Sequence, residues 1–176
     1  MAKQDQMISW LNDAYAMEQS VEQVLQNHVK DAKNHPQLQA KLQEHLQQTK
    51  HHADLVKGCI QRLNGSTSSL KSGLAQVMGT IQGVATGMFQ DELVKNGIQD
   101  YATENFEIAT YTALIAAARD LGDTDTARVC EEIRQDEEGM ARWLLEHLPT
   151  IVTETMQRQQ GAPASEANVQ PGMQAQ

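Results

Sequence analysis

The sequence is poor in cysteine, proline and aromatic residues, and it lacks a long apolar run. Its 176 residues include 2 cysteines, 4 prolines and 4% aromatic residues. Cys59 and Cys130 are too few and too far apart for a disulfide framework, which favours a reducing, cytoplasmic compartment. No stretch reaches the roughly 18 apolar residues of a membrane span, and the N-terminus lacks the apolar core of a signal peptide. We therefore expect neither secretion nor a membrane partner.

Basic charge is scarce as well. The chain has 14 Lys+Arg against 23 Asp+Glu, a formal charge of −9. Phosphate repels such a chain, so nucleic acid is not an expected partner. Strong helix formers dominate instead, namely Ala, Gln, Glu, Leu, Met and Lys. This composition predicts one all-α domain.

Apolar residues recur every three or four positions in four segments, which predicts helices at about 5–32, 36–63, 89–120 and 124–147. In the third segment the predicted inward row includes Tyr101, Glu104, Ile108 and Tyr111. The connections before Pro36 and around Gly122 are short, so each flanking pair of helices should be an antiparallel hairpin.

Local signals predict where these helices begin and end. Pro36 suits the first turn of a helix, Asn64-Gly65 suits a C-terminal cap, and Asp123 offers a capping oxygen. Pro149 is expected to stop the last helix.

Two regions of the chain do not fit the long helices. Residues 64–88 are expected to form a long crossover containing one or two short helices. Residues 155–176, rich in Gln, Ala, Pro and Gly, are predicted to be a disordered tail outside a domain of residues 1–154, most simply a solvated end. Two hairpins joined by one long crossover give the connectivity of a ferritin-like four-helix bundle.

Three glutamates interrupt the apolar rows of three different helices. Burying Glu18, Glu104 and Glu137 without partners costs several kcal/mol each, so their placement calls for a common explanation. Ferritin-like di-metal sites supply one, because they take Glu from two helices and Glu-x-x-His from the other two. Carboxylate and imidazole ligands together suit Fe or Mn.

The match to that template is incomplete. Gln48 stands where the second helix should carry Glu, and Met140 stands where the fourth should carry His. The second helix still offers His45 and His52 as nitrogen donors. The alternative is a metal-depleted bundle that acts as a non-enzymatic interaction or structural protein.

Several motifs resemble the YciE/YciF-like branch of the ferritin-like superfamily, with similarity over about residues 8–148. They are Tyr15-Ala16-Met17-Glu18-Gln19, Pro36-Gln37-Leu38, Glu44-His45-Leu46-Gln47-Gln48-Thr49, Asn105-Phe106-Glu107-Ile108-Ala109-Thr110-Tyr111 and Asp136-Glu137-Glu138. The resemblance implies a bundle that forms a homodimer, a di-metal site in its core and a role in bacterial stress response. It also implies that relatives carry Glu at the position of Gln48.

The residues and the resemblance together give one hypothesis for the site. The expected metal positions are Glu18, His45, Gln48, Glu104, Glu107 and Glu137, to which helical spacing adds His52. Tyr111 is expected beside them, as a hydrogen-bond donor or redox-active neighbour. The leading hypothesis is a cytoplasmic stress-response protein with a two-metal Fe or Mn centre that reacts with oxygen or peroxide. Because Gln48 supplies no charge, one of the two metal positions is expected to be only partly occupied. Whether it turns over a substrate is left open.

Overall fold

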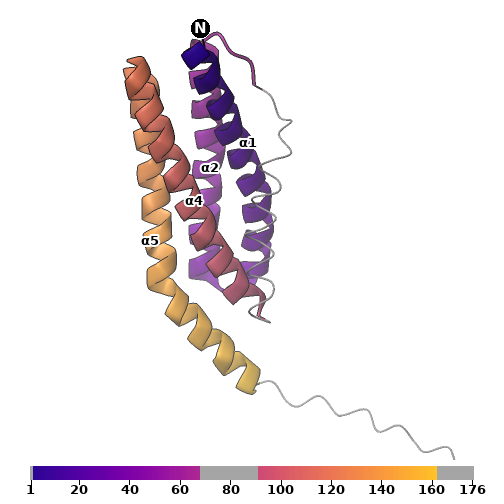
Figure 1. The fold of residues 1–176 in the computed structure, drawn as a ribbon. Coiled ribbons are helices and arrows are strands. Elements are labelled where there is room, and N and C mark those ends of the chain that lie inside the picture. The colour runs from indigo at the N-terminus through magenta and orange to yellow at the C-terminus, as the bar shows by residue number, and fades with distance from the viewer. Residues whose placement is uncertain (1, 68–90, 162–176) are drawn as a thin grey trace, which may run out of the picture.

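The computed structural model describes residues 2–67 and 91–161, and the elements in these ranges are helices (Figure 1). In chain order they are α1 (Ala2–Asp31), the 3-10 turn η1 (Ala32–Asn34), α2 (Pro36–Arg62), α4 (Glu92–Leu121) and α5 (Thr124–Gly161). The all-α prediction is confirmed for the described part of the chain. The short helices predicted within 64–88 fall almost wholly on residues 68–90, outside that part.

The long helices pack as two antiparallel hairpins that lie side by side. α1 packs on α2 and α4 packs on α5, while the α1–α4 and α2–α5 contacts join the hairpins. The N-terminal ends of α1 and α4 lie at opposite ends of the bundle, so α2 and α4 run in the same direction (Figure 1). Each helix therefore presents one side to a shared interior.

The predicted end signals act at the helix boundaries. Pro36 occupies the first turn of α2, and Asn64 adopts a left-handed conformation (φ 60°) after its end. The Asp91 carboxylate accepts hydrogen bonds from two backbone amides and so begins α4 at residue 92 rather than 89. Asp123 caps α5 by accepting from the Thr126 amide at 3.0 Å.

The prediction that Pro149 stops the last helix is wrong, because α5 continues through it to Gly161. Proline removes one helical hydrogen bond, that of the Leu145 carbonyl, and Leu145 is 55% exposed, so water can replace the partner. Ile151 packs into the core and Glu154 lies 3.2 Å from His35, which anchors the segment after the proline. α5 changes direction partway along its length (Figure 1). The predicted tail was therefore too long by residues 155–161, and residues 162–176 lie outside the described part.

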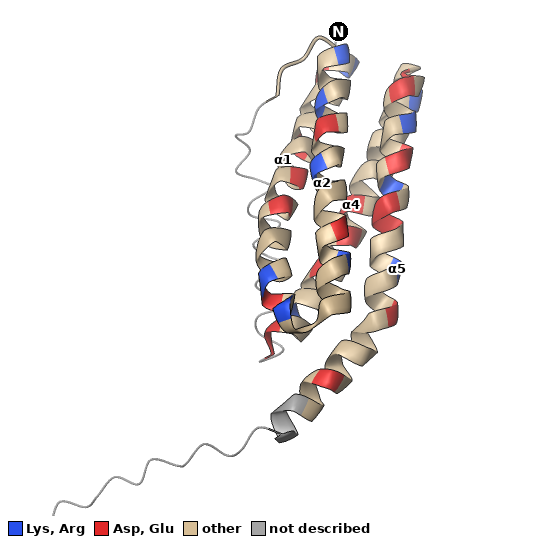
Figure 2. Ribbon diagram, turned by 180° about the vertical axis from the view of Figure 1, so that it is seen from behind, with Lys and Arg blue, Asp and Glu red and all other residues tan. Residues whose placement is uncertain are grey.

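The interior combines apolar packing with a polar layer. Leu11, Val56, Leu114 and Ile133 belong to one hydrophobic cluster to which α1, α2, α4 and α5 all contribute. Cys59 and Cys130 are buried and unbonded to each other, as expected for small core residues. Acidic residues occur on every helix, and red segments of α4 are visible between α2 and α5 at mid-height (Figure 2).

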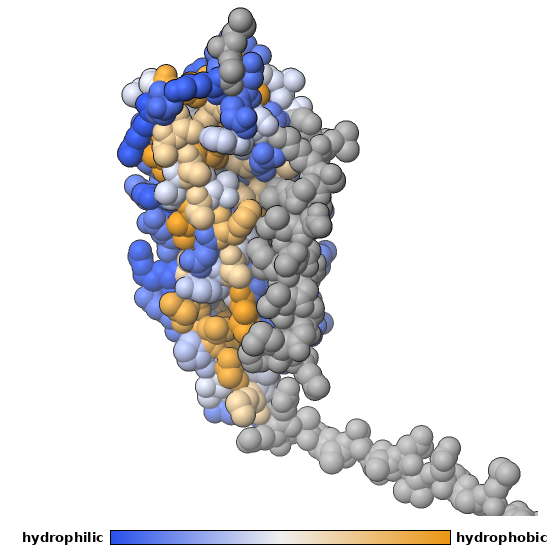
Figure 3. Space-filling view, viewed as in Figure 1, coloured by the Kyte–Doolittle hydropathy of each residue, from blue (hydrophilic) through white to orange (hydrophobic). Residues whose placement is uncertain are grey.

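The outward side of α4 is unusually apolar. Its partly or fully exposed positions between 101 and 118 carry no charged residue. Figure 3 views the molecule from this side and shows apolar residues along it, with hydrophilic residues at the margin. Among the described helices, none is long and apolar enough to cross a membrane.

Candidate metal centre

Four glutamates and two histidines meet inside the bundle. Glu18 comes from α1, Glu104 and Glu107 from α4, and Glu137 from α5, and each is exposed by 1% or less. His45 and His52 of α2 are buried to the same degree. The predicted convergence of Glu18, Glu104 and Glu137 is therefore confirmed, with all four long helices contributing to the cluster.

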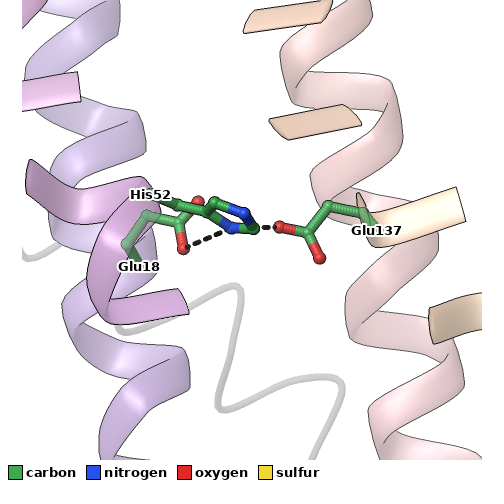
Figure 4. Close-up of side chains that lie close together, drawn as sticks. All are labelled: Glu18, His52 and Glu137. Carbon is green, nitrogen blue, oxygen red and sulfur yellow. Dashed lines mark ion pairs between the residues drawn. The ribbon is translucent and has the colours of Figure 1, made fainter. Parts of the chain in front are cut away.

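The first group of candidate ligands consists of Glu18, His52 and Glu137 (Figure 4). The Nδ1 atom of His52 lies 2.9 Å from Glu137 Oε1 and 3.8 Å from Glu18 Oε2. One potential ligand atom from each residue lies within 4.8 Å of the others. Figure 4 shows the imidazole between the two carboxylates, so the three side chains face a common point.

The second group shares Glu137 with the first and adds His45 and Glu104. His45 Nε2 lies 3.1 Å from Glu104 Oε1 and 3.5 Å from Glu137 Oε2. The two oxygens of Glu137 thus face different histidines, Oε1 toward His52 and Oε2 toward His45. A carboxylate placed in this way can bridge two cations.

The far nitrogen of each histidine has its own polar partner. His52 Nε2 lies 3.1 Å from Asp136 Oδ2, and His45 Nδ1 lies 3.3 Å from Gln48 Oε1. Because both partner atoms are acceptors, these hydrogen bonds favour a proton on the far nitrogen, so the neutral imidazole directs its lone pair into the cluster. Gln48, predicted at a metal position, is only partly buried and contacts the side of His45 away from the carboxylates.

Tyr111 closes the cluster on the Glu18 side. It is fully buried, and its hydroxyl donates a short hydrogen bond to Glu18 Oε1. The contact leaves Glu18 Oε2 directed toward His52.

Most ligand atoms in the cluster lack a hydrogen bond within the described part of the chain. The unsatisfied atoms are Glu18 Oε2, His45 Nε2, His52 Nδ1 and both carboxylate oxygens of Glu104, Glu107 and Glu137. The histidine and glutamate atoms approach at ion-pair distances without hydrogen-bond alignment. Buried polar atoms normally have partners, and each one without a partner costs about 1–3 kcal/mol. Cations placed among these oxygens and nitrogens would satisfy many of them at once, so the residues fit Fe or Mn.

The metal-free cluster holds protons at neutral pH. Burial raises the pKa of Glu18 to about 8, with the charge of Glu137 acting in the same direction. Burial likewise raises the pKa of Glu137 to about 7 and the pKa values of Glu104 and Glu107 well above the ordinary range. Burial opposes protonation of His52, but Glu137 and Glu18 outweigh it and raise its pKa to about 9. Like charges packed in an apolar interior disfavour simultaneous ionisation.

Two acidic residues near the cluster, Asp136 and Asp100, were given no role from the sequence. Asp136 is half-exposed and lies beside Glu137 in the chain, so neither helical periodicity nor burial singles it out. Asp100 is buried one turn before Glu104, and the i,i+4 spacing would have found it. The prediction that Tyr101 and Ile108 face inward was wrong. The buried residues of α4 at this level are their neighbours Asp100 and Glu107, together with Glu104 and Tyr111 as predicted.

A bundle with this connectivity, in which glutamates and histidines of all four helices surround one centre, defines the ferritin-like class. Over residues 2–157 the chain matches the family described as "Domain of unknown function (DUF892)", and it belongs to that family. A protein of Xanthomonas campestris is 34% identical to it, with a TM-score of 0.78 over 91% of this chain and 99% of the other.

Two further solved structures share the fold at lower identity. The Escherichia coli stress protein YciF is 19% identical, with a TM-score of 0.73 over 86% of this chain and 97% of its own. The bacterioferritin of Desulfovibrio desulfuricans, a protein with a diiron site, is also 19% identical, with a TM-score of 0.71 over 98% and 96%. The resemblance to the YciE/YciF-like branch is thus confirmed for family and fold.

Proposed function

We propose that this protein is a ferritin-like stress-response protein that binds two Fe or Mn ions in the bundle core. The observation that carries the proposal is the pair of ligand groups that share Glu137. Glu18 and His52 would complete one position, and His45 and Glu104 the other. Glu107 adds a fourth carboxylate, so four negative charges would balance two divalent cations.

The chain's own residues prepare the centre for such ions. Asp136 and Gln48 orient the two imidazoles, Tyr111 holds one oxygen of Glu18, and the surrounding apolar residues exclude water. A bound iron or manganese pair would supply redox chemistry toward oxygen or peroxide. The stress role rests on analogy with the stress protein YciF, and the proposed cytoplasmic location rests on the two cysteines that are not joined in a disulfide.

The alternative, a metal-depleted bundle that acts only through its surface, explains the interior less well. Such a protein gains nothing from four buried glutamates, and apolar residues of similar volume are often neutral or stabilising at such positions. Substitution at two template positions, Gln48 and Met140, favours this alternative. The nine unsatisfied ligand atoms of the cluster favour the metal centre.

Metal analysis of the purified protein tests the proposal. Chelator-treated protein reloaded without oxygen should retain between one and two Fe or Mn ions per chain, because Gln48 leaves one position short of charge. Glu137→Gln should lose most of both, because each position uses this residue. Glu132→Gln changes the same charge at an exposed position of α5 and serves as the control. Equal metal content in the parent and Glu137→Gln would contradict the proposal.

We also propose that the protein forms a homodimer through the apolar side of α4 and the start of α1. A groove of about 450 Å³ lies there, lined by Met7, Trp10, Ala113, Ala117 and neighbouring residues, and Trp10 is 45% exposed. Light scattering should give twice the mass of one chain, and Trp10→Glu should halve it. A monomeric parent protein would contradict this proposal and leave the metal proposal untouched.

A further inference from the structure

Two cysteines, Cys59 of α2 and Cys130 of α5, lie in the core near the end of the bundle where α2 ends and α5 begins. Each is 0% exposed, both belong to the hydrophobic cluster, and both are free thiols. Neither belongs to a group of side chains in the described ranges that could chelate a metal ion. The metal centre therefore gives no reason for two thiols at this level of the bundle.

Two contacts fix the register of α2 against α5. His52 Nε2 lies 3.1 Å from Asp136 Oδ2, and Arg62 Nη2 donates a hydrogen bond of 2.7 Å to Thr126 Oγ1. The step from His52 to Arg62 along α2 equals the step from Asp136 back to Thr126 along α5, as expected for antiparallel neighbours. Residues between the two contacts can therefore be paired across the interface by their positions in the chain.

This register places the two thiols opposite each other. Cys59 lies one turn before Arg62 on α2, and Cys130 lies one turn after Thr126 on α5. Because the helices are antiparallel, both steps lead in the same direction along the bundle. Burial and then the charge of Cys59 raise the pKa of Cys130 to about 12, so the two sulfurs lie within electrostatic range of each other. Small facing residues of two packed helices meet the main requirement of a disulfide, which is a close approach of the two backbones.

Arg62 provides the chemical environment for a reaction at Cys59. Its side chain is 41% exposed, so it reaches from solvent to the edge of the core. Burial opposes the charge of Arg62, but Cys59, through charge and a hydrogen bond, and the nearby Asp123 outweigh it and raise the pKa of Arg62. A guanidinium beside a sulfur stabilises the thiolate, which is the nucleophilic form of cysteine.

The position of Cys59 in the last turn of α2 gives an oxidant a route to the pair. α2 ends at Arg62, and the Cys59 carbonyl accepts the hydrogen bond of the Leu63 amide at 3.2 Å, just past the end of the helix. Terminal turns of helices open locally at a lower free energy than helix interiors. Opening of this turn exposes Cys59 while the rest of the bundle stays folded.

We propose that Cys59 and Cys130 form a peroxide-sensitive dithiol that closes to a disulfide joining α2 to α5. The Cys59 thiolate attacks one peroxide oxygen and the O–O bond breaks. The second oxygen leaves as hydroxide and takes up the proton that Cys59 gave up, which leaves a sulfenic acid on Cys59 and one water. The Cys130 sulfur then attacks the Cys59 sulfur, and its proton passes to the departing hydroxide, which leaves as a second water. Two thiols are oxidised, one hydrogen peroxide is reduced to two waters, and a dithiol reductant restores the pair.

Peroxide treatment of the full-length protein tests the proposal. With a chelator present, hydrogen peroxide in small excess should remove both free thiols, counted after denaturation. A tryptic digest should then contain residues 58–62 and 129–134 joined by a bond that a dithiol reductant breaks. Two thiols that stay free, or disulfides that form only between chains, would overturn the proposal. The chelator makes this result independent of the metal centre, whose failure would appear only in the metal analysis.

Variants assign the roles of the two thiols and of Arg62. In Cys130→Ser the sulfenic acid on Cys59 should persist and react with dimedone, whereas Cys59→Ser should leave Cys130 unlabelled. Arg62→Gln should slow disulfide formation several-fold. Arg128→Gln removes the same charge at an exposed position of α5 and should not slow it. Labelling of Cys130 in place of Cys59, or equal rates in the two arginine variants, would overturn these roles, and the digest of the parent protein tests the disulfide even if a serine variant does not fold.

Discussion

At the scale of single residues, Glu137 is the feature that distinguishes this interior from ordinary core packing. Its two carboxylate oxygens lie near two different histidines, and it contributes to both candidate ligand groups. A glutamate that only snorkelled to the surface would have one oxygen in water. Glu137 is 1% exposed, and both of its oxygens lack hydrogen bonds among the described residues.

Gln48→Glu should raise metal affinity about tenfold. The new carboxylate would accept the His45 Nδ1 proton more strongly than the amide oxygen does, which orients Nε2 toward the centre, and changes in such supporting contacts typically alter metal affinity by about 10–100-fold. Metal content after dialysis against a weak chelator measures the effect. Glu44→Gln, which alters an exposed position on α2, is the control. Equal metal content in Gln48→Glu and the parent would show that position 48 does not act on the centre.

From the residues alone, the site could be predicted mainly where a charged side chain occurs among the apolar residues of a helix. Glu18 and Glu104 stand out because each is a charge in an apolar row, and His52 follows from helical spacing. The contact of Gln48 with His45, and that of Asp136 with His52, depend on side-chain rotamers across helices, which periodicity does not encode. The pairing of His28 with Asp100 joins residues 72 positions apart and required the fold.

At the scale of elements, helix ends followed local chemistry except where tertiary contacts outweighed it. The predicted caps at Pro36 and Asp123 act as expected, whereas α5 passes through Pro149 because the following turns dock on the α1–α2 connection. The inward-facing residues of α4 could not be predicted from hydrophobicity alone, because the helix is apolar on most of its sides.

Ile151→Ala should destabilise the protein by about 2–5 kcal/mol, because Ile151 packs into the core after the proline and its truncation leaves a cavity. Leu145→Ala, at an exposed position on the same helix, should cost less than about 1 kcal/mol. Urea unfolding of both variants gives the two values. Similar small losses would mean that the helix beyond Pro149 is not docked on the bundle.

At the scale of the whole molecule, the buried acids make stability depend on pH. Glu18 and Glu137 have pKa values of about 8 and 7 in the folded state, against a reference of 4.5, and His52 has a pKa of about 9 against 6.5. Between each pair of values the folded state binds more protons than the unfolded state. The free energy of unfolding of the metal-free protein should therefore fall as pH rises from about 4.5 to about 9.

Thermal midpoints of chelator-treated protein should accordingly be lower at pH 8 than at pH 5.5. Each 1 kcal/mol lost corresponds to about 2–4 °C for a chain of this size. The Glu18→Gln/Glu137→Gln variant should show a flatter dependence. Mn²⁺ at a hundredfold excess over its Kd should restore about 2.7 kcal/mol to the parent at pH 8. A midpoint that rises with pH in the metal-free parent would contradict the raised pKa values.

The most direct test of the metal centre is anomalous diffraction from crystals soaked in Mn²⁺, recorded at the manganese absorption edge. We expect two peaks inside the bundle, one among Glu18, His52 and Glu137 and one among His45, Glu104 and Glu137, with Glu137 beside both. Crystals that bind Mn²⁺ only at surface carboxylates, with no peak beside Glu137, would contradict the proposed metal centre.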